Sequence, residues 1–294
     1  MKRRDFVKSS VLGLSYLSIA PNLIRCSSAS EASEIGIQLY SLRTLLEKDF
    51  TGTIEKVAEI GFTHVELFNY ENGKIYGFSA KEIAEILSNS GLRATSGHIA
   101  LGEHTPDKVG TLANGWKKAA EDAKLMGQEF IVCPWLEETE RDSIEDYKRH
   151  AETFNRCAEI AEEIGLQFAY HNHDFEFKVL DGEMPMNILL EECDPALVKF
   201  ELDLYWVHRA GKDPLAIFNR HKKRFPLWHV KDMDSTPEKY FAPVGDGVID
   251  WKKMFKNQKI AGLKYFYVEQ DHFRKYEPLD AVEKSINYLK ELGV

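Results

Sequence analysis

Cysteine is scarce in this chain: four occur in 294 residues, at positions 26, 133, 157 and 193. Their spacing matches no cysteine metal site and excludes a dense disulfide framework. Cys133, Cys157 and Cys193 lie in apolar or amphipathic patterns or near a predicted helix end. We therefore expect these three residues to be buried thiols.

Basic residues are also in short supply. The 38 Lys and Arg residues are outnumbered by 47 Asp and Glu residues, which gives a formal net charge of -9. Binding of nucleic acid requires clustered Lys and Arg side chains that displace counterions from the phosphates. Because the sequence contains no basic stripe, we expect no nucleic-acid partner.

The apolar-leaning stretch from Val11 to Ile24 is too short to span a bilayer, which takes about 20 residues. It follows Lys2, Arg3 and Arg4, which is the layout of a signal peptide. The paired arginines and the Asp-Phe-Val-Lys after them resemble the twin-arginine export signal of bacteria. We expect residues 1–30 to be removed on export to the periplasm, with no transmembrane segment in the mature chain.

Two other interpretations of this segment stay open. The first is an N-terminal helix that carries basic residues. The second is a lipoprotein processing site at Cys26, although Arg25 departs from the small-residue pattern of such sites.

From Ile35 onward, short β-rich apolar runs alternate with longer stretches of helical periodicity, as in consecutive βαβ units. Eight such units close into a barrel, whereas an open doubly wound sheet has about five or six strands and a glycine-rich nucleotide loop. We therefore predict an α/β fold, a parallel (β/α)8 barrel with outer helices, over residues 31–294. The eight strand candidates are Ile35–Leu39, His64–Phe68, Arg93–His98, Phe130–Pro134, Gln167–His171, Val198–Asp203, Leu227–Lys231 and Tyr265–Glu269.

Helix signals lie between these strands. Ser79 precedes Glu82 at the spacing of a capping box. A glycine follows four of the helical runs, where a left-handed residue is needed, at Gly61, Gly91, Gly127 and Gly165. The helix candidates are Gly52–Ile60, Ser79–Ser90, Asp107–Met126, Ser143–Ile164, Pro214–His221 and Leu279–Leu292.

Polar residues close the last four predicted strands. Catalytic groups in such a barrel project from the carboxyl ends of several strands, so these residues are expected to meet at one rim. Two imidazoles and two carboxylates suit a Mn, Co, Zn, Fe or Mg ion. We predict that one divalent metal ion is held by His171, Asp203, His229 and Glu269.

The choice within two pairs of residues stays open. Side chains two positions apart in a strand share a face, so His171 and His173 are interchangeable candidates, as are Glu201 and Asp203. A single His at a strand end is more often a hydrogen-bonded structural residue than a ligand. The metal prediction therefore depends on the four strand ends occurring together.

Eight stretches carry a family resemblance: Gly36-Ile37-Gln38-Leu39-Tyr40-Ser41-Leu42-Arg43, Gly61-Phe62-Thr63-His64-Val65-Glu66, Ser96-Gly97-His98, His171-Asn172-His173, Glu201-Leu202-Asp203, His229-Val230-Lys231-Asp232, Gly245-Asp246-Gly247-Val248-Ile249-Asp250-Trp251 and Val268-Glu269. With them, the chain from Ile35 onward resembles the xylose isomerase-like sugar phosphate isomerase/epimerase family of TIM barrels. The resemblance implies a metal-dependent isomerase or epimerase that removes a proton next to the carbonyl of a sugar or sugar derivative.

One position departs from the usual pattern of that family. Its strand-five motif is Glu-x-His, in which the Glu binds metal and is often paired with the last-strand Glu for two-base epimerisation. This chain has His171 there, which keeps a metal ligand but removes one carboxylate of the pair. The Tyr-His-x-His variant resembles the inosose dehydratase-like and keto-glycoside lyase branches, so a lyase or dehydratase is the alternative.

Under this hypothesis, Glu269 or His173 would take the proton, and Lys231 and His98 would donate to the developing oxyanion. An ordinary ion pair explains Lys231 as well as a catalytic role does. For the Trp residues, core packing is the default explanation. Substrate contacts are expected from Gln38, Glu66, Trp135, Trp206 and Asp246.

Two other functional classes stay open. A metal-dependent phosphodiesterase related to the endonuclease IV barrels would need several metal ions and a basic surface, against which the acidic charge argues. A non-catalytic sugar-binding protein would keep the aromatic faces without the metal. Export favours a free sugar, a cyclitol or an oxidised glycoside over a phosphorylated substrate, and the sequence leaves homo-oligomer formation open.

Overall fold

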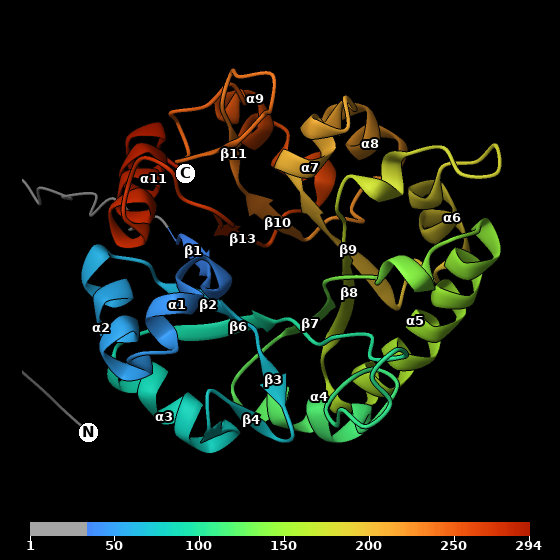
Figure 1. Ribbon diagram of the computed structural model, residues 1–294, viewed down its shortest axis with the longest axis horizontal. Helices are drawn as coiled ribbons and strands as arrows, with labels where there is room; N and C mark the ends of the chain where they lie inside the picture. The colour runs from blue at the N-terminus through green and yellow to red at the C-terminus, as the bar shows by residue number, and fades with distance from the viewer. Residues whose placement is uncertain (1–33) are drawn as a thin grey trace, which may run out of the picture. The chain divides into compact units, whose positions relative to one another are not determined.

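Eight parallel strands form a nearly closed barrel at the centre of the molecule (Figure 1). The computed structural model describes residues 34–294, so the predicted export signal and the alternative at Cys26 lie outside the described residues and stay predictions. Each of the eight barrel strands lies within a predicted one, which confirms the (β/α)8 barrel. The barrel strands are β1 (Gly36–Gln38), β2 (His64–Leu67), β6 (Arg93–Gly97), β7 (Phe130–Cys133), β8 (Gln167–His171), β9 (Val198–Asp203), β10 (Leu227–Val230) and β13 (Tyr265–Val268).

The strands lie in the order β6-β2-β1-β13-β10-β9-β8-β7, and β1 pairs with both β2 and β13. The ring is completed between β6 and β7, where His98 and Val132 form an isolated bridge. Backbone hydrogen bonds cross there from Glu129 N to Thr95 O (3.0 Å) and from Ile99 N to Val132 O (2.8 Å). We call this boundary the β6–β7 seam.

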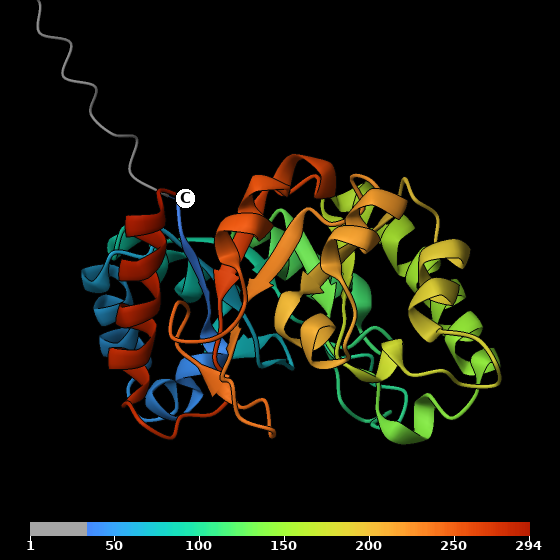
Figure 2. The ribbon, with the colours of Figure 1, turned by 90° about the horizontal axis from the view of Figure 1, so that it is seen from above.

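Helices surround the barrel (Figures 1 and 2). The last helix lies beside α2 in both views, and Lys290 Nζ donates to Ile60 O at 3.2 Å. Among the described residues, no helix has the length and apolar character needed to cross a bilayer. The helices are α1 (Arg43–Leu46), α2 (Phe50–Ile60), α3 (Ala80–Asn89), α4 (Trp116–Leu125), α5 (Ile144–Ile164), α6 (Pro185–Glu192), α7 (Leu204–Arg209), α8 (Pro214–Arg220), α9 (Trp251–Lys256), α10 (Gln258–Ala261) and α11 (Pro278–Leu292).

Short accessory elements follow several barrel strands and shape the loops at their carboxyl ends. After β2, a three-stranded antiparallel sheet joins β3 (Tyr70–Glu71), β4 (Lys74–Ile75) and β5 (Phe78–Ser79). After β10, β11 (Asp232–Met233) pairs antiparallel with β12 (Phe241–Ala242). Single 3-10 turns are η1 (Leu39–Leu42), η2 (Glu138–Glu140) and η3 (Phe175–Phe177).

Most helix ends follow their sequence signals. Ser79 and Glu82 form the predicted capping box at the start of α3, with each side chain bonded to the other's backbone N–H. The four predicted helix-ending glycines all have positive φ: Gly61 at 101°, Gly91 at 74°, Gly127 at 91° and Gly165 at 83°. A side chain would be strained at these angles, so glycine is what allows each helix to stop.

The helix predicted from Asp107 to Met126 requires a correction, because α4 begins only at Trp116. Gly110 and Gly115 have φ values of 94° and 78°, which a right-handed helix cannot contain. Instead of a helix, this stretch forms a turn, which is closed where Gly110 N donates to Asn114 O at 2.8 Å. Residues 107–115 are therefore a loop at the mouth of the barrel.

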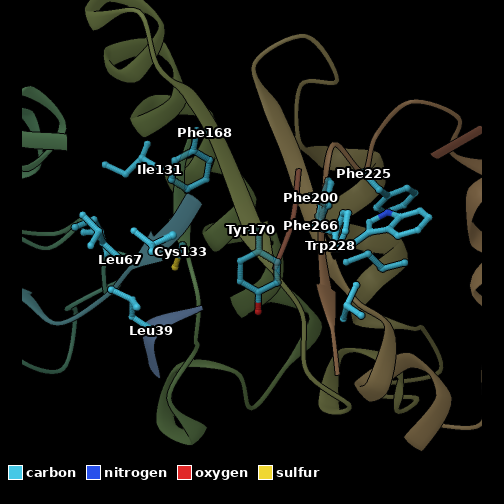
Figure 3. Close-up of a cluster of buried hydrophobic side chains, with 14 of the residues drawn as sticks. Leu39, Leu67, Ile131, Cys133, Phe168, Tyr170, Phe200, Phe225, Trp228 and Phe266 are labelled. Carbon is cyan, nitrogen blue, oxygen red and sulfur yellow. The ribbon is translucent and has the colours of Figure 1, made fainter. Parts of the chain in front are cut away.

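Side chains alternate along the strands between the helices and the barrel interior. Phe168 and Tyr170 of β8 pack against Phe154 of α5, with ring centroids 5.5 and 5.1 Å apart, in the main core shown in Figure 3. Burying each such side chain stabilises the fold by about 1.5–3 kcal/mol. A separate inner cluster closes the barrel beneath the mouth and consists of Phe130, Val132, Ala169, Leu227, Tyr265 and Tyr267.

The three cysteines of the described region belong to this interior. Cys133, Cys157 and Cys193 are buried and free, which confirms the prediction of buried thiols. Burial raises the pKa of the Cys133 thiol beyond its ordinary range, so this side chain is neutral and behaves as a small apolar residue.

Candidate active site at the barrel mouth

A pocket of about 580 Å³ opens beyond the carboxyl ends of the barrel strands. This volume falls within the range of small-molecule sites, which is about 300–1,000 Å³. Its lining combines ionisable groups with aromatic rings. The ionisable groups include His98, His171, His173, Lys231, Glu269 and Asp271, and the aromatic ones include Tyr40, Phe68, Trp135 and Trp206.

A set of polar side chains extends from the pocket into the barrel, and we call it the lower cluster: Gln38, Glu66, His98, Glu201 and His229. Of these, only His98 lines the pocket, and the other four are fully buried. His98 Nε2 lies 3.1 Å from Glu66 Oε2 and 3.0 Å from Glu201 Oε2. His229 Nε2 lies 2.6 Å from the same Glu66 oxygen, to which Gln38 Nε2 donates at 2.7 Å. Neither Glu66 nor Glu201 lines the pocket.

A second set, the upper cluster, consists of Asp203, His229, Lys231, Glu269 and Asp271, of which the last three line the pocket. Lys231 Nζ lies 3.0 Å from Asp203 Oδ2 and 2.7 Å from Glu269 Oε2. The same nitrogen lies 2.9 Å from Asp271 Oδ1. His229 Nδ1 is 2.7 Å from Glu269 Oε2, so the His229 ring belongs to both clusters.

Strand geometry accounts for both clusters. Glu201 and Asp203 on β9 lie two residues apart and so share the inward face, as do His229 and Lys231 around the end of β10. Asp203 is fixed further because its Oδ1 accepts from Trp206 N at 3.0 Å as the cap of α7. The first member of each pair lies deeper in the barrel and the second lies nearer the pocket.

Charge within the lower cluster is shared between imidazoles and carboxylates. Burial alone would lower the pKa of His98, but Glu66 and Glu201 raise it to about 9. Burial would likewise lower the pKa of His229, whereas Glu201 and Glu269 hold it well above its ordinary value. Both rings therefore carry a proton at neutral pH when no metal ion is bound.

Lys231 sets the charge state of the upper cluster. Burial would raise the pKa of Glu269, but Lys231 and His229 hold it well below its usual range. Burial raises the pKa of Asp203 to about 6, and Lys231 opposes part of that rise. At neutral pH both carboxylates are ionised and able to bind a cation.

His171 and His173, between which the sequence left the choice open, have different surroundings. His171 Nδ1 lies 3.0 Å from Glu201 Oε2, and its Nε2 lies 3.8 Å from Asp203 Oδ2. His173 lies among aromatic rings, with its centroid 4.6 Å from that of Trp135, and its Nδ1 has no hydrogen-bond partner. Burial lowers the pKa of both rings well below the ordinary value, so both are neutral.

The donor set fits a divalent metal ion. Ligand atoms of Asp203, His229 and Glu269 lie within 4.8 Å of one another, and those of His98, His171, Glu201 and His229 form an overlapping group. Three of the four predicted ligands therefore meet directly, and His171 lies beside them. Glu201 Oε1 and Asp203 Oδ2 are buried without a hydrogen-bond partner, although Lys231 Nζ is close to the latter. Nitrogen and oxygen donors of this kind suit Zn, Mn, Fe or Co.

The structure places three of the predicted substrate contacts away from the pocket. Gln38 and Glu66 are fully buried in the lower cluster, where they contact His98 and His229. Asp246 lines a separate cleft against α11 and pairs with Lys284 at 3.1 Å. Trp135 and Trp206 line the pocket, and their contact with a substrate stays a prediction.

Several pocket residues were absent from the predicted site, and Asp271 and Tyr40 are two of them. Asp271 follows Glu269 by two positions, so strand alternation was a usable signal for its contact with Lys231. Tyr40 lies in η1 after the first strand and packs edge-on against Phe68, with centroids 5.4 Å apart. A loop aromatic residue of this kind carries no periodic signal in the sequence.

Glu176 holds the backbone of His173 and gives a testable pH dependence. It accepts hydrogen bonds from His173 N (2.9 Å) and from the Tyr170 hydroxyl (2.5 Å), and burial raises its pKa to about 7. A carboxyl whose pKa is raised on folding stabilises the folded state less as the pH rises from its unfolded value to its folded value. We expect the free energy of unfolding to fall by about 2–3 kcal/mol more between pH 4.5 and 8 in the wild type than in Glu176→Gln.

Urea unfolding of both proteins across this pH range measures the difference. The glutamine side chain keeps the size and an acceptor oxygen for His173 N, so the variant is expected to fold. Parallel stability curves for the two proteins would contradict the expected contribution of Glu176.

Comparison with known proteins agrees with the fold. The sequence model of the xylose isomerase-like TIM barrel family matches residues 54–292. An inosose dehydratase from Geobacillus thermodenitrificans is 26% identical over 277 residues, which cover 83% of this chain and 90% of that protein. A crystal structure of a sugar phosphate isomerase/epimerase from Parabacteroides distasonis is 29% identical, with a TM-score of 0.78 over 92% of this chain and 98% of that one.

A more distant structure, the IolI protein with a zinc atom, has a TM-score of 0.71 at 15% identity and covers 89% of this chain and 98% of that one. At this identity the likeness is one of fold. The family match extends over well more than half of the sequence and includes seven of the eight barrel strands. The chain therefore belongs to the xylose isomerase-like TIM barrel family.

Proposed function

We propose that the protein is a divalent-metal-dependent carbon–oxygen lyase. It would remove a proton next to the carbonyl of a sugar or cyclitol derivative and expel a neighbouring oxygen substituent. The observation that carries this proposal is the convergence of Asp203, His229 and Glu269 on one point beside the pocket. The similarity to an inosose dehydratase over 83% of the chain supports elimination as the outcome.

Four side chains would hold the ion: His171, Asp203, His229 and Glu269. When bound, a divalent ion supplies Lewis-acid polarisation of a carbonyl oxygen. Lys231 places a second positive charge at the same wall of the pocket, 2.7 Å from Glu269 Oε2. Since Asp203 and Asp271 hold the pKa of Lys231 well above its ordinary value against the effect of burial, it acts as a fixed cation.

The proton on the substrate carbon needs an acceptor, and His173 suits this role better than Glu269. Glu269 is ion-paired with Lys231 and His229, so its carboxylate would have to give up these ion pairs to take a proton. His173 lines the pocket as a neutral imidazole with an unpartnered Nδ1. A neutral ring of this kind accepts a proton without first giving up an ion pair.

The departing oxygen needs a proton donor, and His98 is suited to supply it. His98 lines the pocket, and Glu66 and Glu201 raise its pKa to about 9 against the effect of burial, so it is protonated at neutral pH. One proton thus passes from the substrate carbon to His173, and another passes from His98 to the leaving oxygen. Trp135 and Trp206 would offer apolar faces to the sugar ring.

Isomerisation or epimerisation, the first expectation from the sequence, is the second candidate. The 29% identity to a sugar phosphate isomerase/epimerase structure favours it. Both reactions begin with the same proton removal, but epimerisation requires reprotonation at the same carbon. The chain has His171 in place of one carboxylate of the family's two-base pair, so elimination remains the preferred outcome.

Proton NMR in deuterated water tests the proposal. The protein is incubated with a panel of inososes, keto sugars and 3-keto glycosides. We expect a new alkene signal or a released substituent for at least one substrate. Dialysis against a chelator is expected to lower this rate at least about 100-fold, and stoichiometric Zn, Mn or Co should restore it.

Other outcomes of this experiment point elsewhere. Deuterium on a retained carbon of an intact sugar would establish the isomerase or epimerase. Full activity of a preparation that elemental analysis shows to be free of metal would contradict metal dependence. Tight sugar binding without any turnover would support a binding protein.

A further inference from the structure

The rings of His171 and His229 each connect the lower cluster to the upper one. His171 turns Nδ1 to Glu201 Oε2 at 3.0 Å and Nε2 towards Asp203 Oδ2 at 3.8 Å. His229 places Nε2 3.1 Å from Glu201 Oε2 and Nδ1 2.7 Å from Glu269 Oε2. In both rings, one nitrogen thus faces Glu201 and the other faces a proposed metal ligand.

Strand register places Glu201 between the two histidines. It is the lateral partner of His171 on β8 and of Leu227 on β10, two residues before His229. Its side chain is fully buried and does not line the pocket. A substrate in the pocket therefore does not touch Glu201, and any effect of this residue on the site passes through the imidazoles.

The charge of Glu201 is compensated in an unusual way. Within residues 34–294, its ion pairs are with His98, His171 and His229, at 3.0, 3.0 and 3.1 Å, and involve no Lys or Arg. A buried carboxylate costs several kcal/mol unless hydrogen-bond donors face it. The imidazole N–H groups are those donors, so the carboxylate dictates which nitrogen of each ring carries the hydrogen.

A ring with one N–H has a lone pair on its other nitrogen. A hydrogen on His171 Nδ1 leaves the lone pair on Nε2, which faces Asp203. His229 Nε2 also lies 2.6 Å from Glu66 Oε2, which can accept its hydrogen. A hydrogen on this nitrogen leaves the lone pair on Nδ1. Both lone pairs then point into the upper cluster, where the ion would lie.

We propose that Glu201 is a positioning residue that fixes the orientation and tautomer of His171 and His229 for metal binding. The proposal also assigns the ligand atoms, which are Nε2 of His171 and Nδ1 of His229. It rests on the metal dependence in the proposed function. Carboxylates that hold the second nitrogen of a metal-bound His in this way change metal affinity about 10–100-fold when they are replaced.

The first test uses the zinc-loaded wild-type protein. Long-range proton–nitrogen NMR correlations report which nitrogen of each His carries hydrogen. We expect N–H at Nδ1 of His171 and at Nε2 of His229, with the assignment made by His171→Asn and His229→Asn spectra. The opposite tautomer at either residue would overturn the proposal, and this result needs no folded Glu201 variant.

The second test compares two buried Glu→Gln substitutions. Glu201→Gln is expected to weaken zinc affinity by 10–100-fold in a competition titration with a coloured chelator. Glu176→Gln is the matched control, because Glu176 is equally buried but contacts Tyr170 and the backbone of His173. Its zinc affinity is expected to stay within twofold of the wild type.

Circular dichroism of both variants confirms that the comparison is made on folded protein. A folded Glu201→Gln with wild-type zinc affinity overturns the positioning role and leaves the proposed function intact. A wild-type protein that binds no divalent ion overturns the metal dependence, and the positioning role fails with it. The two failures are therefore distinguishable.

Discussion

Glu269→Gln is expected to lower kcat/KM by about 10²–10⁴ while the protein stays folded. Glu269 Oε2 lies 2.7 Å from His229 Nδ1 and 2.7 Å from Lys231 Nζ. The amide keeps the shape of the side chain but removes its charge. One change thus removes a proposed metal ligand and the counterion of Lys231, so both metal content and turnover should fall. Steady-state kinetics and elemental analysis of the purified variant measure the two effects.

The matched control for this change is Glu191→Gln. Glu191 is on α6 and forms an exposed ion pair with Arg220 at 3.2 Å, of a kind worth little to stability. We expect wild-type kinetics and metal content from this variant. A Glu269→Gln protein that keeps more than a third of wild-type kcat/KM would show that the charge of Glu269 is not needed.

Asp232→Ala is expected to lower the free energy of unfolding by about 3–5 kcal/mol. Asp232 is fully buried and holds the loop that follows β12. Its Oδ2 accepts from Gly245 N at 2.9 Å and from Trp251 Nε1 at 2.9 Å, and Oδ1 accepts from Ile249 N at 3.2 Å. Alanine would leave these donors buried without partners, and each unmet donor costs about 1–3 kcal/mol. Urea unfolding measures the loss.

Asp232→Asn separates hydrogen bonding from side-chain size. The asparagine keeps one acceptor oxygen, but its NH2 group must face backbone or indole donors, so an intermediate loss is expected. Glycine at 247 belongs to the same arrangement, since a Cβ there would lie 2.1 Å from Asp232 Oδ1. A loss below about 1 kcal/mol for Asp232→Ala would mean that water replaces the carboxylate.

Several strands of this fold are readable from the sequence because they are bounded on both sides. A glycine ends the preceding helix, as Gly61 and Gly165 do, and a polar residue marks the carboxyl end, as Glu66 and His171 do. The segment at 107–126 lacked such clear limits. Its apolar residues continue at helical spacing through Gly115, and only the backbone angle at that glycine shows where α4 begins.

The site is only partly readable from the sequence. Strand alternation brings Asp203, His229 and Glu269 to one rim, and this much follows from the fold. The lower cluster depends on how far each side chain reaches across the barrel, which a linear pattern does not contain. Glu66 therefore suggested a substrate contact, although in the structure it bonds His229 beneath the pocket.

Asp246 shows the other limit of sequence reasoning. The Gly-Asp-Gly motif that contains it shapes the loop held by Asp232, and this explains the glycines without any contact to a ligand. A motif can thus accompany a site because it supports the surrounding loop. The sequence alone does not tell a substrate contact from a loop-supporting role for Asp246. The structure does, because it places Asp246 in a cleft against α11.

The β6–β7 seam has a consequence for how a ligand enters. Paired residues run along four positions between β8 and β9, whereas β6 and β7 share one bridge. Separation of these two strands breaks few backbone hydrogen bonds, and regions held by few contacts open locally at a lower free energy than the rest of the core. The bridge includes His98, and Trp135 follows β7 by two residues, so both flank the seam. We therefore expect the barrel to open more readily at this seam, beside the proposed proton donor His98, than between the strands β8 and β9, which carry two of the proposed metal ligands.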